Sequence, residues 1–158
     1  MATSQEPFFI IDGHIDLAWN ALEFGRDPHL SAHQTRLREE GTSIPDYIGQ
    51  CTTGFPDWVA GGFGLLFVTT FVMPRAQADP RSRFVYDNPE EAAQLGLQVR
   101  QYYHTLVEAD PALKLIQTQQ DLADLAAERV AGKNTLGLLM LMEGAEPLRD
   151  PAELPEWY

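Results

Sequence analysis

The stretch FGLLFVTTFV at residues 63–72 decides the fold class, because it offers no polar face to water. Its residues are aliphatic, β-branched or aromatic, and apolar side chains do not alternate with charged ones. Strands of this composition are typical of parallel sheets that are covered on both faces by other elements. We therefore predict a parallel sheet with helices packed against it.

Three other apolar runs predict further strands, and helical patterns lie between them. Residues 8–11 are expected to form a buried strand that ends in a turn at residues 12–13. Residues 113–116 are expected to form a short strand, and residues 136–142 the last one. Because strands alternate with helices along the chain, the sequence favours an α/β fold.

Four helices are predicted from capping residues and apolar spacing. Asn88, followed by Pro89 and Glu91, is typical of a helix start, and apolar residues then recur at helical spacing as far as residue 106. The other three helices are expected at residues 17–24, at residues 32–40 and between residues 118 and 132. The rest of residues 25–61 is predicted to be loop, because prolines and glycines interrupt it.

The composition excludes several classes of function. The chain has 158 residues, of which 44% are hydrophobic and 22% charged, as is typical of one soluble globular domain. Its net charge of −12 gives no basic surface for nucleic acid or for an anionic membrane. No apolar run is long enough for a membrane span or a secretory leader, so a cytoplasmic location is predicted. Cys51 is the only cysteine, which excludes an internal disulfide and leaves a small, partly buried thiol.

Two short segments with residue types that can bind a metal come immediately after predicted strands. DGHID at residues 12–16 follows the first strand, and EGAE at residues 143–146 follows the last. In parallel α/β folds, sites are built at the edge where strands end. His14 and Asp16 are two residues apart, so in extended backbone both side chains project to the same side, and Glu143 is expected to approach from the other strand. One imidazole and carboxylates are ligands that zinc accepts.

Other interpretations of the histidines stay open. The pair His14 and Asp16 is also compatible with a capped turn that holds a hydrogen-bonded histidine. His29 and His33 have the spacing of zinc-binding helices but lack the glutamate of that motif, which favours a solvated helix face or loop. His104 falls late in a long predicted helix and is expected to be structural.

Three motifs in order resemble the membrane (renal) dipeptidase family. DGHID resembles the signature with which those enzymes open, and MEGAE at residues 142–146 is similar to a motif that ends a later strand of the family. AGGFGLLFVTTFVMP at residues 60–74 resembles the glycine-rich lead into the second strand of the family's barrel. Leu65 and Leu66 depart from the more polar pair that many members carry, which leaves the subfamily open.

The resemblance implies a (β/α)8 TIM barrel, of which residues 1–158 would be the N-terminal portion of a single, truncated domain. It implies a site with two zinc ions, in which His14 and Asp16 bind one metal and Glu143 bridges both as the one catalytic residue of this portion. The two ions would share a hydroxide that attacks the peptide bond of a dipeptide. The remaining ligands and the substrate-binding groups would lie beyond Tyr158, so the portion alone is expected to be inactive.

Two alternatives to this function remain. Another amidohydrolase-like metal hydrolase would have a His-x-His pair after the first strand, where this chain has His14 and Asp16, and that difference disfavours it. The second alternative is a non-catalytic half-barrel that assembles with a second polypeptide. Its partner would be a further copy of the chain, giving a homo-oligomer, or a complementary C-terminal half.

Overall fold

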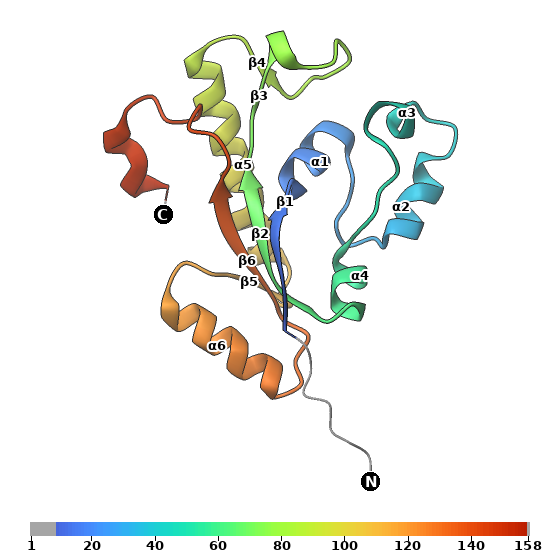
Figure 1. The fold of residues 1–158 in the computed structure, drawn as a ribbon, viewed down its shortest axis with the longest axis vertical. Coiled ribbons are helices and arrows are strands. Elements are labelled where there is room, and N and C mark those ends of the chain that lie inside the picture. The colour runs from blue at the N-terminus through green and yellow to red at the C-terminus, as the bar shows by residue number, and fades with distance from the viewer. Residues whose placement is uncertain (1–8, 158) are drawn as a thin grey trace.

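The core of the fold is a four-stranded parallel sheet in the order β1-β2-β6-β5 (Figure 1). The computed structural model describes residues 9–157. The central strands are β2 (Phe63–Thr70) and β6 (Leu136–Met142), which pair in continuous register. Strand β1 (Ile10–Ile15) lies beside β2, and the short β5 (Leu113–Leu115) lies beside the first half of β6. The α/β class and the parallel sheet predicted from the sequence are confirmed.

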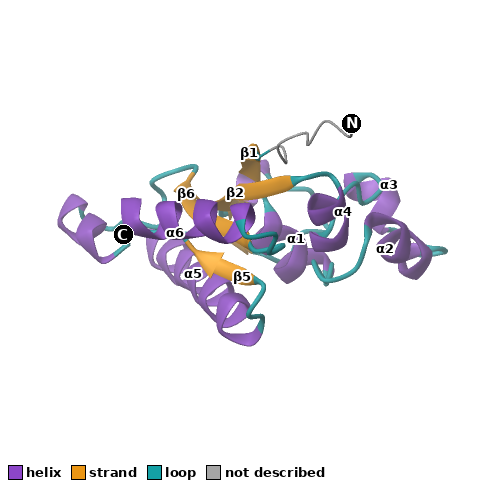
Figure 2. Ribbon diagram, turned by 90° about the horizontal axis from the view of Figure 1, so that it is seen from below, coloured by secondary structure: helices purple, strands orange, loops and turns teal. Residues whose placement is uncertain are grey.

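The two faces of the sheet carry separate apolar clusters, because successive side chains of a strand point to opposite faces. On one face, Leu66 of β2 packs with residues of helices α1 (Leu17–Phe24) and α5 (Pro89–Ala109). On the other face, Leu65 packs with Leu125 of helix α6 (Gln119–Val130). Figure 2 shows α5 running along one side of the sheet.

Side-chain caps start the helices where the sequence indicates. The Asn88 side chain accepts a hydrogen bond from the backbone N–H of Glu91 at the start of α5. Ser31 and Thr118 form capping boxes that start α2 (Ala32–Glu39) and α6. The four predicted helices are confirmed, with ends that differ by at most a few residues, although α1 begins without a side-chain cap.

The prediction for the first strand was wrong in two respects. The first is its end, because β1 continues through residues 12–13, where a turn was expected. Phe8, where the predicted strand begins, lies outside the described residues. The strand is also largely exposed, with Ile11 at 52% of its full accessibility. The physical reason is its position, because β1 is the edge of the sheet in the described part of the chain and has a neighbour only in β2.

The segment of residues 25–61 contains more helix than predicted. Two short helices, α3 (Ile44–Ile48) and α4 (Phe55–Ala60), lie in a region that was expected to be loop. Each has a proline in its first turn, where the missing N–H costs no helical hydrogen bond. Helices α2, α3 and α4 gather on one side of the sheet, next to β1 (Figures 1 and 2).

Smaller elements complete the described chain. Strands β3 (Met73–Pro74) and β4 (Val85–Tyr86) form a separate two-stranded sheet, and a 3-10 turn at Arg75–Gln77 lies between them. A second 3-10 helix, Pro151–Glu156, lies near the C-terminus. No helix within residues 9–157 is long and apolar enough to cross a membrane.

Candidate metal centre

A bulge near the end of β1 sets the position of His14. Asp12 pairs with Leu66 and Ile15 with Val68, so β1 advances three residues where β2 advances two. The extra residue falls in the segment that contains His14, whose backbone N–H donates to Oδ1 of Asp12 at 3.1 Å. Bulges often redirect a side chain next to a functional site. The His14 side chain is left half exposed, at 49%.

Asp16 follows β1 directly and is the N-cap residue of helix α1. Its side chain makes no capping hydrogen bond. Instead, Oδ1 of Asp16 accepts a hydrogen bond of 2.6 Å from the hydroxyl of Thr69, a buried residue of β2. The carboxylate is therefore held toward the neighbouring strand and away from the helix it precedes.

Glu143 is the first residue after β6. Its backbone N–H lies 3.4 Å from the carbonyl oxygen of Thr70, so the hydrogen-bond ladder between β2 and β6 continues to this residue. Because β1, β2 and β6 are parallel, the ends that carry these acidic residues meet at one edge of the sheet. The backbone thus brings a carboxylate from β6 toward the segment that ends β1.

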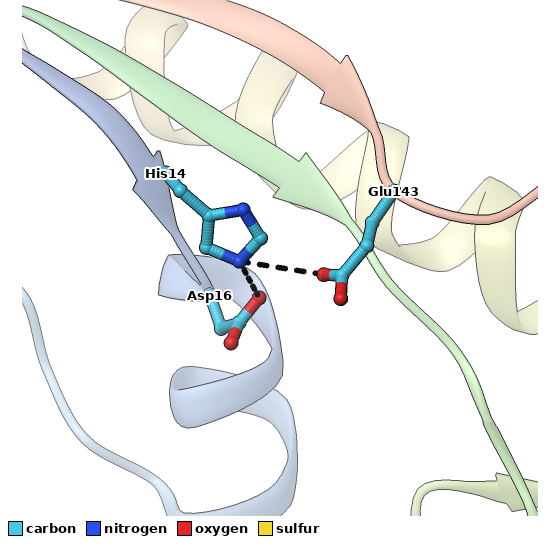
Figure 3. Close-up of side chains that lie close together, drawn as sticks. All are labelled: His14, Asp16 and Glu143. Carbon is cyan, nitrogen blue, oxygen red and sulfur yellow. Dashed lines mark ion pairs between the residues drawn. The ribbon is translucent and has the colours of Figure 1, made fainter.

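The three predicted metal ligands converge, as Figure 3 shows. Nε2 of His14 lies 3.6 Å from Oδ1 of Asp16 and 3.5 Å from Oε2 of Glu143. Each residue offers one ligand atom, and these three atoms lie within 4.8 Å of one another. The carboxylate side chains are 35% and 39% exposed, so the cluster is open to solvent.

The distances from Nε2 of His14 to the two carboxylates fit a metal better than they fit direct hydrogen bonding. Separations of 3.5 and 3.6 Å are longer than a hydrogen bond from an imidazole to a carboxylate. Two ligand atoms at adjacent corners of a tetrahedral zinc site, each about 2.0–2.2 Å from the metal, lie about 3.3–3.6 Å apart. One imidazole and two carboxylates are also ligand types that zinc accepts. These residues fit a metal of the zinc type.

The other histidines lie apart from this cluster. His29 is in a turn before α2, with Nδ1 at 3.0 Å from Asp27 and Nε2 at 3.3 Å from Asp110. His33 is an exposed residue of α2 and does not share a helix with His29, so the predicted solvated helix face and loop are confirmed. His104 lies within α5 and outside the cluster, and its structural role stays a prediction.

Two residues next to the candidate metal centre were missed by the sequence analysis. The sequence predicts only that Thr69 belongs to a buried strand and Tyr103 to a long helix. The Tyr103 hydroxyl donates to the carbonyl oxygen of Thr69 at 2.8 Å and accepts the backbone N–H of Ala18 at 3.1 Å. A buried tyrosine hydroxyl needs a hydrogen-bond partner, but the sequence does not show which group that partner is.

Comparisons with known proteins identify the family of this chain. The sequence matches the family model described as membrane dipeptidase, peptidase family M19, over residues 2–158. No curated protein sequence matches the chain.

Two solved structures share the fold. The dipeptidase AC, a metallo peptidase, is 20% identical with a TM-score of 0.57, and the match covers 96% of this chain and 40% of that one. A metallo peptidase from Rhodobacter sphaeroides, liganded with a phosphinate mimic of the dipeptide L-Ala-D-Ala, is 18% identical with a TM-score of 0.55. That match covers 96% of this chain and 43% of the other. The chain thus spans less than half the length of either structure.

Proposed function

The chain belongs to the membrane dipeptidase family, and we propose that it forms part of a zinc-dependent enzyme that hydrolyses dipeptides. One observation carries the proposal: His14, Asp16 and Glu143 present three ligand atoms within 4.8 Å of one another. The dipeptide class of substrate is supported by the family description and by the dipeptide mimic bound to one of the similar structures. A cytoplasmic location stays a prediction.

We assign distinct roles to the three residues. His14 and Asp16 would hold the first metal from the end of β1, and Glu143 would approach from β6 and bridge two zinc ions in the complete site. When bound, the metal supplies Lewis acidity toward water and toward the peptide carbonyl. Because each of the two oxygens of its carboxylate can bind one metal, Glu143 would also set the spacing of the two ions.

Metal binding by the purified chain tests this proposal. We expect the wild-type chain to bind zinc after dialysis against a metal-free buffer and readdition of the metal, and His14→Ala to bind it about tenfold more weakly or worse. Elemental analysis gives the stoichiometry, and competition with a chromophoric chelator gives the affinity. His33→Ala is the matched control, since His33 is exposed and lies outside the cluster. Equal zinc binding by wild type and His14→Ala would exclude the site.

The bridging role of Glu143 has its own test, in a complete enzyme that contains this segment. Asp16→Ala should weaken mainly one zinc, whereas Glu143→Gln should lower the content of both. Glutamine keeps the shape of the side chain but loses the charge and turns one oxygen into an amide NH₂ that cannot bind a metal. Metal content after dialysis measures the difference. A stoichiometry for Glu143→Gln equal to that of wild type would show that Glu143 is not a bridge.

A further inference from the structure

Asp16 is an N-cap residue that does not cap its helix. The side chain of an aspartate at this position normally accepts a hydrogen bond from the backbone N–H of the second or third helical residue. That N–H group has no partner inside the helix. In α1 the second helical residue is Ala18, which is fully buried, so its N–H cannot turn to water instead. The Asp16 side chain makes no such bond. Another group must therefore satisfy the N–H of Ala18.

Tyr103 of α5 supplies that group. Its hydroxyl oxygen accepts the N–H of Ala18 at 3.1 Å, and its proton is donated to the carbonyl oxygen of Thr69 at 2.8 Å. Tyr103 has no exposed surface. Burial raises the pKa of its phenol well above the ordinary value, so the hydroxyl keeps its proton and can make both bonds. A residue 85 positions away in the sequence thus performs the capping role.

Thr69 then fixes the carboxylate that the tyrosine leaves free. Its hydroxyl donates to Oδ1 of Asp16 at 2.6 Å and lies 3.3 Å from the carbonyl oxygen of Ile15. Thr69 is only 1% exposed, and its backbone carbonyl is the acceptor of the Tyr103 proton. The chain of contacts therefore runs from Ala18 through Tyr103 and Thr69 to Asp16. It ends on the Asp16 oxygen that lies 3.6 Å from Nε2 of His14.

We propose that Tyr103 is a surrogate N-cap for α1 and that, together with Thr69, it positions the Asp16 carboxylate for metal binding. This inference rests on the proposed metal site. Tyr103 and Thr69 are positioning residues, because they act through Asp16 and do not belong to the group of ligand atoms. Without the tyrosine hydroxyl, the buried N–H of Ala18 would compete with the metal for the carboxylate of the same helix start. Without the threonine hydroxyl, the carboxylate would lose the bond that holds it toward β2.

Zinc affinity tests the inference on the purified 158-residue chain. Tyr103→Phe and Thr69→Val keep the size of the side chain and remove one hydroxyl each. We expect both to weaken zinc binding by about tenfold or more, as is usual when a partner of a metal ligand is removed. Thr69→Ser keeps the hydroxyl and should bind zinc within about twofold of wild type. The dissociation constants are measured by chelator competition, at a temperature where circular dichroism shows each variant to be folded.

Tyr102→Phe is the matched control, because Tyr102 lies beside Tyr103 in α5 and its hydroxyl makes no hydrogen bond with any described residue. Its zinc affinity should equal that of wild type. A second control places Tyr103→Phe in an Asp16→Ala background, where no further loss of affinity is expected if the tyrosine acts through Asp16. Thr69→Val decides the proposal on its own if Tyr103→Phe does not fold.

The outcomes separate the two proposals. A lower melting temperature with unchanged zinc affinity in both Tyr103→Phe and Thr69→Val would show a purely structural role and overturn the inference. So would an equal loss of affinity from Tyr103→Phe with and without Asp16. Failure of the wild-type chain to bind zinc at all would instead remove the metal site itself, and the inference with it.

Discussion

The ionisation of Tyr103 gives the stability of the chain a dependence on alkaline pH. Burial raises the pKa of its phenol above the ordinary value of 10.0, whereas the unfolded chain ionises near that value. Above about pH 10 the folded chain therefore holds a proton that the unfolded chain has released, and the free energy of unfolding falls by up to about 1.4 kcal/mol per pH unit. Below about pH 10 this contribution is fully present.

Urea unfolding at pH values between about 9 and 11 measures this effect. We expect the free energy of unfolding of the wild type to fall over that range, and Tyr103→Phe to fall less steeply. Some decline should remain in the variant, because burial also raises the pKa of Tyr102 to about 12. The same pH slope in wild type and Tyr103→Phe would contradict the expectation.

At the scale of single residues, the sequence indicates the candidate metal ligands but not the residues that contact them. His14, Asp16 and Glu143 could be selected because metal-binding residue types follow two apolar strands. Thr69 and Tyr103 could not be selected, because a threonine in a strand and a tyrosine in a helix stripe are ordinary core residues in the sequence. Their role depends on contacts between residues 34 to 85 positions apart.

At the scale of elements, a buried ion pair links α2 to the short helix α3, which lies in a segment predicted to be loop. Arg26 donates to both oxygens of Glu39 at 2.7 and 3.0 Å and to the carbonyl oxygen of Gly49 at 2.7 Å. The two side chains are 10% and 6% exposed. The guanidinium thus joins the end of α2 to the C-cap of α3, on the side of the sheet next to β1.

Removing Arg26 should destabilise the chain strongly. Arg26→Ala leaves the Glu39 carboxylate buried without its partner, which costs about 3–5 kcal/mol of the free energy of unfolding. Urea unfolding at neutral pH measures the loss. Arg75→Ala is the control, because the pair between Arg75 and Asp87 is more than half exposed and should contribute at most about 1 kcal/mol. Equal losses for the two variants would show that the Arg26 pair is not a structural anchor.

Elements with local signals were predictable, and elements defined by their neighbours were not. Helices α5 and α6 begin at the cap residues Asn88 and Thr118, and each cap and its partner lie within four consecutive residues of the sequence. The exposure of β1 has no local signal, because it depends on which strands pair with it. The order of the strands in the sheet has no local signal either. Strand β5 precedes β6 in the chain but lies at the edge of the described sheet, so β6 is the neighbour of β2. This pairing brings Thr69 and Glu143 to the same end of the sheet.

At the scale of the whole molecule, family and fold were predictable, and the extent of the domain stays a prediction. The resemblance to membrane dipeptidases is confirmed by the family match over residues 2–158 and by two structures of the same fold. The chain covers 40% and 43% of those structures. That residues 1–158 are the N-terminal portion of a single barrel domain stays a prediction, and so does the alternative of a half-barrel that assembles with a second chain.

We expect the 158-residue chain alone not to hydrolyse dipeptides. A (β/α)8 barrel needs about 250 residues. Within residues 9–157, His14, Asp16 and Glu143 form the one group of three that could hold a metal. A two-zinc site needs further ligands for its second ion. The assay measures the free alanine that is released when L-Ala-D-Ala is hydrolysed. Activity that a chelator abolishes and added zinc restores would contradict the expectation.

The position of a bound zinc ion tests the proposed metal site most directly. Crystals of the chain grown with zinc would be measured at the zinc absorption edge, where anomalous scattering locates the metal. We expect a peak about 2.0–2.2 Å from Nε2 of His14 and from one carboxylate oxygen each of Asp16 and Glu143. Well-occupied zinc elsewhere in the crystal, with no peak between these three side chains, would contradict the assignment.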